Sequence, residues 1–300
     1  METTKAKTQP GSSVEELLFK SESTFLCLLL NHRSKQIRVI DFRAGALPAK
    51  RLYIQSIAKQ EGVEKVITLV EKDEVSSWTK VGFVREGTIP GFYKRSDGHL
   101  CGCVIGERTA SDEVSDEGQK LAEKTVVQGK RALSGIPENI KCTFAEPDEE
   151  EVKSARAAAL KKNEAVNAFD EFGRDAQRIY MSATVKRGKP AYLSAEFQDC
   201  FGHSLVEVLK SPKTDDELAA TTAGLRTLGE NLKERGIVSA FGFAPSDDVQ
   251  LATAYLAAGF RKTGLLAHGI RVGNARRDAI LWTRKLANPA GDDADGDDSE

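Results

Sequence analysis

The stretch WTKVGFVREGTI, Trp78 to Ile89, has a counterpart near the other end of the chain in YLAAGFRKTGLL, Tyr255 to Leu266. Both have an aromatic residue, Gly-Phe four positions later, a second glycine, and an aliphatic residue two positions further on. Equivalent positions differ by 255 − 78 = 177 residues throughout, so the alignment needs no gap. We therefore interpret the stretches as equivalent turns of two related units, and expect two mixed sheets that superpose through them.

The apolar pattern around each stretch predicts short strands alternating with helices. From Phe25 to Ile105 the expected order is two strands, helix, strand, helix, two strands. From Ile140 to Lys285 it is strand, helix, three strands, long helix, strand, helix, two strands. This alternation is typical of an α/β (α+β) fold, and 300 residues suffice for two domains.

The composition and the polar segments suggest the domain limits. The last thirteen residues carry six acidic side chains and no basic one, so the rest of the chain has a net charge of −2 − (−6) = +4. Such a tail buries no apolar surface. We expect a disordered N-terminus over 1–14, a first unit over 15–108, a linker over 109–136, a second unit over 137–287 and a disordered acidic tail over 288–300.

Several classes of partner are not expected. No apolar run is long enough to cross a bilayer, and the first ten residues lack the apolar core of a secretion signal, which predicts a cytoplasmic protein. Five scattered cysteines suit free thiols in a reducing compartment, and the group His99, Cys101 and Cys103 lacks a fourth zinc ligand at the usual spacing. Basic residues are dispersed, so we expect neither a nucleic-acid partner nor a metal.

Two longer segments resemble the β-lysine N-acetyltransferase family of the GNAT superfamily. VGFVREGTIPGFYKRSDGHL, from Val81, is similar to that family's Gly-Phe/Tyr, Glu-Ala/Gly and Ile-Pro-Gly-Phe-Phe/Tyr segment. AYLAAGFRKTGLLAHGIRVGNARRDAILWTRKL, from Ala254, shares its Tyr-x-x-x-Gly-Phe/Tyr turn, its Ile-x-Gly turn and a Trp in the last strand. The resemblance covers 36–108 and about 137–287. It implies two tandem GNAT-like domains, the first truncated, with acetyl-CoA as cosubstrate and a small, amino-acid-like primary amine as substrate.

Acetyl transfer needs a base for the amine and a proton for the departing thiolate. Tyr255 stands where the resembled fold keeps a tyrosine that can protonate the thiolate, although it also suits packing of a helix on the sheet. Glu207 aligns with an acidic residue of the fold's central strand, and Glu196 is the alternative base; either also suits the wet end of a strand. The first unit has Trp78 at the tyrosine position, so the catalytic unit would be the second.

The expected cofactor loop departs from the family pattern. The resemblance places cofactor contacts at Leu209, Lys210, Ser211, Thr214 and Asp248. Where the family has a glycine-rich phosphate loop, however, this chain has SPKTDDELAA, in which Thr214 and Glu217 form a helix-capping box. The three acids Asp215, Asp216 and Glu217 there oppose a pyrophosphate. FRAGALPAKR, from Phe42, is a basic but glycine-poor alternative cradle.

Two hypotheses follow from this departure. The first is an acyl-CoA-dependent N-acetyltransferase with weakened cofactor binding. The second is a pseudoenzyme, a non-catalytic scaffold that has lost acetyl-CoA binding and binds a second copy or another protein.

Overall fold

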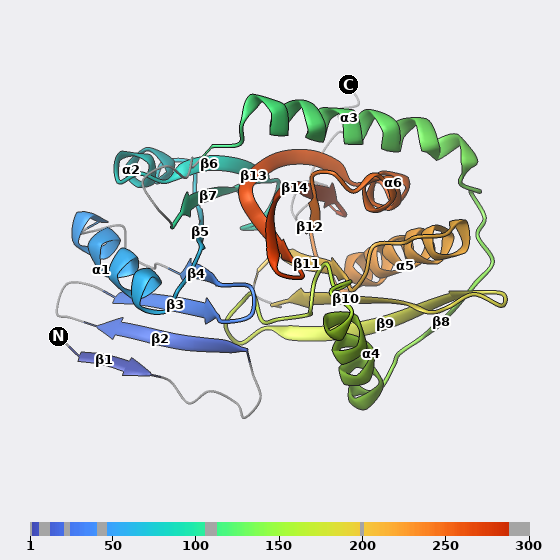
Figure 1. Cartoon of the computed structure of the whole chain (residues 1–300), viewed down its shortest axis with the longest axis horizontal. Helices are drawn as coiled ribbons and strands as arrows, with labels where there is room; N and C mark the ends of the chain where they lie inside the picture. The colour runs from blue at the N-terminus through green and yellow to red at the C-terminus, as the bar shows by residue number, and fades with distance from the viewer. Residues whose placement is uncertain are drawn as a thin grey trace, which may run out of the picture.

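The computed structural model describes residues 2–5, 13–20, 25–40, 47–105, 113–198 and 201–287 (Figure 1). The first unit contains β1 (Glu2–Lys5), β2 (Val14–Lys20), β3 (Phe25–Asn31), β4 (Gln36–Ile40), α1 (Leu47–Gln60), β5 (Lys65–Val70), α2 (Val75–Lys80), β6 (Val84–Ile89) and β7 (Gly98–Val104). α3 (Asp116–Ala132) and a short 3-10 turn, Leu133–Gly135, follow. The second unit contains β8 (Cys142–Ala145), α4 (Glu149–Lys161), β9 (Gln177–Val185), β10 (Ala191–Phe197), β11 (His203–Val208), α5 (Asp215–Glu234), β12 (Ser239–Pro245), α6 (Val249–Ala257), β13 (Arg261–Val272) and β14 (Ala275–Lys285).

The two units have the same topology. Within the described residues, the sheet order is β1-β2-β3-β4-β5-β7-β6-β13-β14-β12-β11-β10-β9-β8, which is symmetric about the β6–β13 junction. Each half has one parallel pair, β4 with β5 and β11 with β12, and its other pairs are antiparallel. The expected α/β fold with two related mixed units is confirmed, and so is the predicted element order from Phe25 to Ile105 and in the second unit.

The first unit is the shorter one. Its helix α1 has 14 residues, whereas the equivalent α5 has 20. Eight residues, 6–13, separate β1 from β2, whereas 31 residues, 146–176, separate the equivalent strands β8 and β9. β1 and β2 were not predicted, and β1 lies within the stretch expected to be disordered. The expected linker contains α3, which packs against α6 of the second unit (Figure 1).

The repeated motif has the same backbone geometry in both units. Gly82 and Gly259 follow α2 and α6 with positive φ angles of 88° and 83°, a conformation that a residue without a side chain adopts at little cost. The strand after each glycine has a β-bulge, between Arg85 and Gly87 and again 177 positions later, between Lys262 and Gly264. The prediction of a structural repeat through the two motifs is therefore confirmed.

The expectation of two separate sheets is wrong, because the second glycine of each motif joins them. Gly87 of β6 and Gly264 of β13 pair with each other at the centre of the sheet. A Cβ on Gly264 would lie 2.5 Å from the carbonyl oxygen of Glu86 and 2.6 Å from the Cα of Gly87. Only glycine permits this backbone approach, and the pairing covers two strand edges that would otherwise be open.

Buried polar groups also cross the junction. Lys65 Nζ donates to Glu86 Oε1 at 2.6 Å, and the same oxygen accepts from the backbone N–H of Ala267 at 3.0 Å. Phe92 of the first unit stacks on His203 of the second with ring centroids 3.6 Å apart. The core of the second unit includes Phe92, so the two units share apolar packing.

His203 predicts a specific pH dependence of stability. Burial lowers its pKa to about 3, so the native state stays unprotonated while the unfolded chain takes up a proton below the ordinary histidine pKa of about 6.5. This group alone should reduce the free energy of unfolding by about 1.4 kcal/mol per pH unit as the pH falls from about 6.5 toward 3. We expect His203→Phe, which keeps the stack on Phe92, to show a shallower decline.

Urea unfolding at pH 6.5, 5.5 and 4.5 measures this slope. His268→Asn is the matched control, because His268 is exposed and its positive φ of 50° suits Asn. Equal slopes for wild type and His203→Phe would contradict the assignment.

Candidate functional site

A cavity of about 350 Å³ lies where the second unit faces the first. β11 pairs with β12 only from His203 to Leu205, so the two strands diverge toward the end of β11. The cavity lies beside this divergence, and the segment 163–172 forms one of its walls. Its lining includes Leu29, Asn31, Arg33 and Arg38 from the first unit and Leu205, Glu207 and Phe243 from the second.

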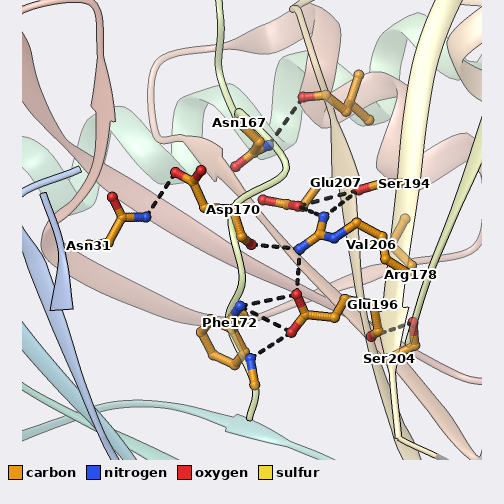
Figure 2. Close-up of polar contacts among 12 residues, drawn as sticks. Asn31, Asn167, Asp170, Phe172, Arg178, Ser194, Glu196, Ser204, Val206 and Glu207 are labelled. Carbon is orange, nitrogen blue, oxygen red and sulfur yellow. Dashed lines mark hydrogen bonds and ion pairs between the residues drawn. The ribbon is translucent and has the colours of Figure 1, made fainter. Parts of the chain in front are cut away.

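Both predicted bases are bound to one arginine, Arg178 (Figure 2). Its guanidinium donates to Glu207 Oε2 at 2.5 Å and, through the other terminal nitrogen, to Glu196 Oε2. Ser194 Oγ lies 2.8 Å from the first of these nitrogens. Arg178 on β9 is directly opposite Glu196 on β10, and Glu207 on β11 is opposite Ser194, so the sheet register brings these side chains together.

The two carboxylates have different surroundings. Glu196 also accepts from the backbone N–H groups of Phe172 and Gly173, at 3.0 Å and 2.6 Å. Glu207 lines the cavity. Burial raises the pKa of Glu207, and the positive charge of Arg178 opposes that rise. Of the two predicted bases, Glu207 is therefore the one beside the cavity, and it already carries a counter-ion.

Tyr255 does not line the cavity. Its side chain is fully buried, and its hydroxyl donates to the carbonyl oxygen of Val206 at 3.3 Å. The ring stacks parallel to Trp282, with centroids 5.8 Å apart, and meets Phe260 edge-on. Burial and the negative charge of Glu207 raise the pKa of the phenol. Tyr255 therefore has the role of packing its helix on the sheet, which was one of the two roles that the sequence allowed.

The free backbone edge at the end of β11 is covered by the chain itself. The Leu209 carbonyl accepts from the N–H of Val166 at 2.8 Å, whereas the Leu209 N–H continues the pairing with β10 and donates to Tyr192 O at 3.0 Å. Asn167 Nδ2 donates to Val208 O at 3.2 Å, and Lys210 forms a β-bridge with Ala165. An extended cosubstrate arm would have to displace 165–167 to bind along this edge.

The remaining predicted cofactor residues are engaged in helix capping. Thr214 accepts from the N–H of Glu217 at 3.2 Å, which confirms the predicted cap, and Glu217 Oε2 accepts from the N–H of Lys213, one residue before the cap, at 2.7 Å. Asp248 accepts from the N–H of Leu251 at 2.9 Å at the start of α6. Burial raises the pKa of Asp248, and a hydrogen bond with Ser211 opposes the rise.

Part of the alternative cradle, and one of the five cysteines, belong to residues that the structure does not describe. Phe42 to Gly45 and Cys200 lie outside the described residues. Lys50, from the other end of the alternative cradle, is buried in α1. None of the described helices is long and apolar enough to span a membrane.

The arginines and the aspartate around the cavity were not predicted from the sequence. Asp170 accepts hydrogen bonds from Ser13 Oγ and Asn31 Nδ2, both at 2.8 Å, and pairs with Arg33, which attaches the segment 163–172 to the first unit. Arg38 and Arg178 each lie within an otherwise apolar strand pattern. A charged residue at such a position needs a buried partner, and that signal was available from the sequence.

No protein-family model and no curated protein matches the chain. Solved structures of N-acetyltransferases are similar to about half of it. Spermidine N-acetyltransferase from Vibrio cholerae, solved with CoA and spermine, is 7% identical with a TM-score of 0.40 and covers 49% of this chain and 96% of its own. The ribosomal-protein-S18-alanine N-acetyltransferase from Escherichia coli is 14% identical with a TM-score of 0.36 and covers 53% of this chain and 99% of its own.

Proposed function

We propose that this protein binds a small molecule between two GNAT-like units and does not transfer an acetyl group. The observation that carries the proposal is the covered edge of β11, where Val166 and Asn167 donate to the carbonyl oxygens of Leu209 and Val208. A cavity of about 350 Å³ remains beside that edge, within the size range of small-ligand sites. The fold would thus keep a binding site without room for an extended cosubstrate along the strand.

The side chains expected to perform the chemistry support the same proposal. The hydroxyl of Tyr255 is fully buried and donates to a backbone carbonyl. A general acid must reach the atom that it protonates, directly or through one water. Glu196 and Glu207 share the charge of Arg178, and two aspartates follow Thr214 at the start of α5, where a phosphate group would bind.

N-acetyl transfer to a small primary amine, with acetyl-CoA as cosubstrate, is the second candidate function. The favouring observation is that Glu207 lines the cavity, so an amine bound there would have a carboxylate close by. This function would require 165–167 to move away from β11.

Calorimetry with acetyl-CoA and an acetyl-transfer assay over a broad amine panel separate the two candidates. We expect neither binding nor transfer. The double variant Asp215→Gly, Asp216→Gly should also fail to bind acetyl-CoA, because the edge of β11 stays covered. Acetyl transfer that Glu207→Gln abolishes would overturn the proposal and favour the enzyme.

Tyr255→Phe provides a further test. We expect the variant to lose about 1 kcal/mol of unfolding free energy, the net worth of one hydrogen bond, because the stack on Trp282 remains. Ligand binding in the cavity should be unchanged. In the acetyltransferase alternative the same variant would instead lower the transfer rate by about 10²-fold or more.

A further inference from the structure

Arg38 of β4 differs from the other arginines around the cavity. Its guanidinium stacks over the ring of Phe172, 3.9 Å from the centroid, and donates to the Phe172 carbonyl. Among the residues that the structure describes, Arg38 forms no ion pair, and its buried Nε finds no acceptor. Arg33 pairs with Asp170, and Arg271 pairs with Glu64 at 3.1 Å.

The carboxylates of the cavity wall, by contrast, have donors. Asp170 accepts from Ser13, Asn31 and Arg33, and Glu207 accepts from Arg178 and Ser194. Glu171 also lines the cavity but is exposed to solvent. The nearby Glu196 is occupied by Arg178 and two backbone N–H groups. Among the described residues, Arg38 is therefore a charged group at this site whose guanidinium still lacks a hydrogen-bond acceptor at Nε.

Arg38 is half-buried, and a cation with too few acceptors in such a place is costly unless something supplies negative charge. Burial lowers the pKa of Arg38 to about 10 and the charge of Glu196 opposes that shift, so the side chain remains charged at neutral pH. Its planar guanidinium offers donors that match the oxygens of a carboxylate or phosphate. Arg33, from the same hairpin, also has a buried nitrogen without an acceptor among the described residues.

We propose that the cavity binds a small organic anion, whose carboxylate or phosphate group is held by Arg38 with Arg33 beside it. This assignment rests on the proposed function, in which the cavity is a ligand site. It gives the first unit a role that its own motif does not predict: it supplies the cationic wall of a site whose other wall belongs to the second unit.

Calorimetry on the full chain tests the assignment with succinate, inorganic phosphate and succinamide, the uncharged analogue of succinate. We expect succinate or phosphate to bind and succinamide not to bind. The anion that binds more tightly identifies the group. Arg38→Met should weaken that binding about ten- to a hundredfold, as loss of a charge-assisted hydrogen bond implies. Arg131→Met, at an exposed position on α3, is the matched control and should bind as wild type does.

Arg38→Lys keeps the charge without the planar fork, so it tests the assignment if the Met variant does not fold. It should bind more weakly than wild type. Succinamide binding, or anion binding that neither Arg38 variant changes, would overturn the anion assignment but leave the cavity as a ligand site. No binding by any of the three compounds would also overturn the anion assignment, whereas acetyl transfer by the wild type would overturn the proposed function separately.

Discussion

Arg178→Met is expected to lower the free energy of unfolding by about 3–5 kcal/mol, the usual cost of removing one partner from a buried ion pair. The variant leaves Glu196 and Glu207 buried in neighbouring strands without their shared cation. It also removes the donor that holds the Asp170 carbonyl at 2.5 Å, so the segment 163–172 loses an attachment to the second unit.

The loss of unfolding free energy in Arg178→Met should depend on pH. Burial already raises the pKa of Glu207, and loss of Arg178 raises it further. A carboxyl with a raised native pKa binds a proton in the native state before it does so in the unfolded chain, so stability increases as the pH falls toward the ordinary glutamate value. We therefore expect the deficit of Arg178→Met to be smaller at pH 5 than at pH 8.

Urea unfolding at both pH values measures these effects. Arg277→Met is the matched control, because Arg277 forms an exposed ion pair with Asp247 at 3.1 Å, and such pairs contribute at most about 1 kcal/mol. If both variants lost the same small amount at pH 8, the buried cluster would not stabilise the fold in the way that we describe.

Gly264→Ala is expected to cost about 3 kcal/mol or more, because the new Cβ meets backbone atoms and not a flexible side chain. The clash falls on Glu86 and Gly87, at the pairing that joins the two units. Denaturant unfolding should show either a large loss of stability or a split into two transitions, if the units separate before they unfold.

Gly135→Ala is the control, since a Cβ at Gly135 meets no atom within 4 Å. It should change stability by less than about 0.5 kcal/mol, as is usual for surface substitutions. A Gly264→Ala variant as stable as this control would mean that the two strands do not approach each other as closely as described.

The local elements and their repetition could be predicted from the sequence. Helix ends, glycine turns and strand periodicity depend on nearby residues, so the order of elements and the equivalence of Gly82 with Gly259 were predictable. The helix cap at Thr214 was predictable for the same reason, because its donors lie within three residues.

The short edge strand β1 was not predicted, because four residues give too little periodicity to recognise. The joining of the two sheets was also missed. The motif contains Gly87 and Gly264, but nothing in the local sequence indicates that these two glycines meet each other.

The contacts and burial of the site residues could not be predicted, because they depend on how distant parts of the chain pack. Tyr255, Glu196 and Glu207 were chosen for what their side chains do in isolation, but their neighbours come from distant parts of the chain. Arg178 lies 29 positions from Glu207, and Val206 lies 49 positions from Tyr255. The accessibility of an ionisable group and its proton affinity depend on burial and on charges brought close by folding. The residues next to it along the chain do not reveal either of these. The cationic wall at Arg38 arises in the same way, because packing of the first unit against Phe172 creates it.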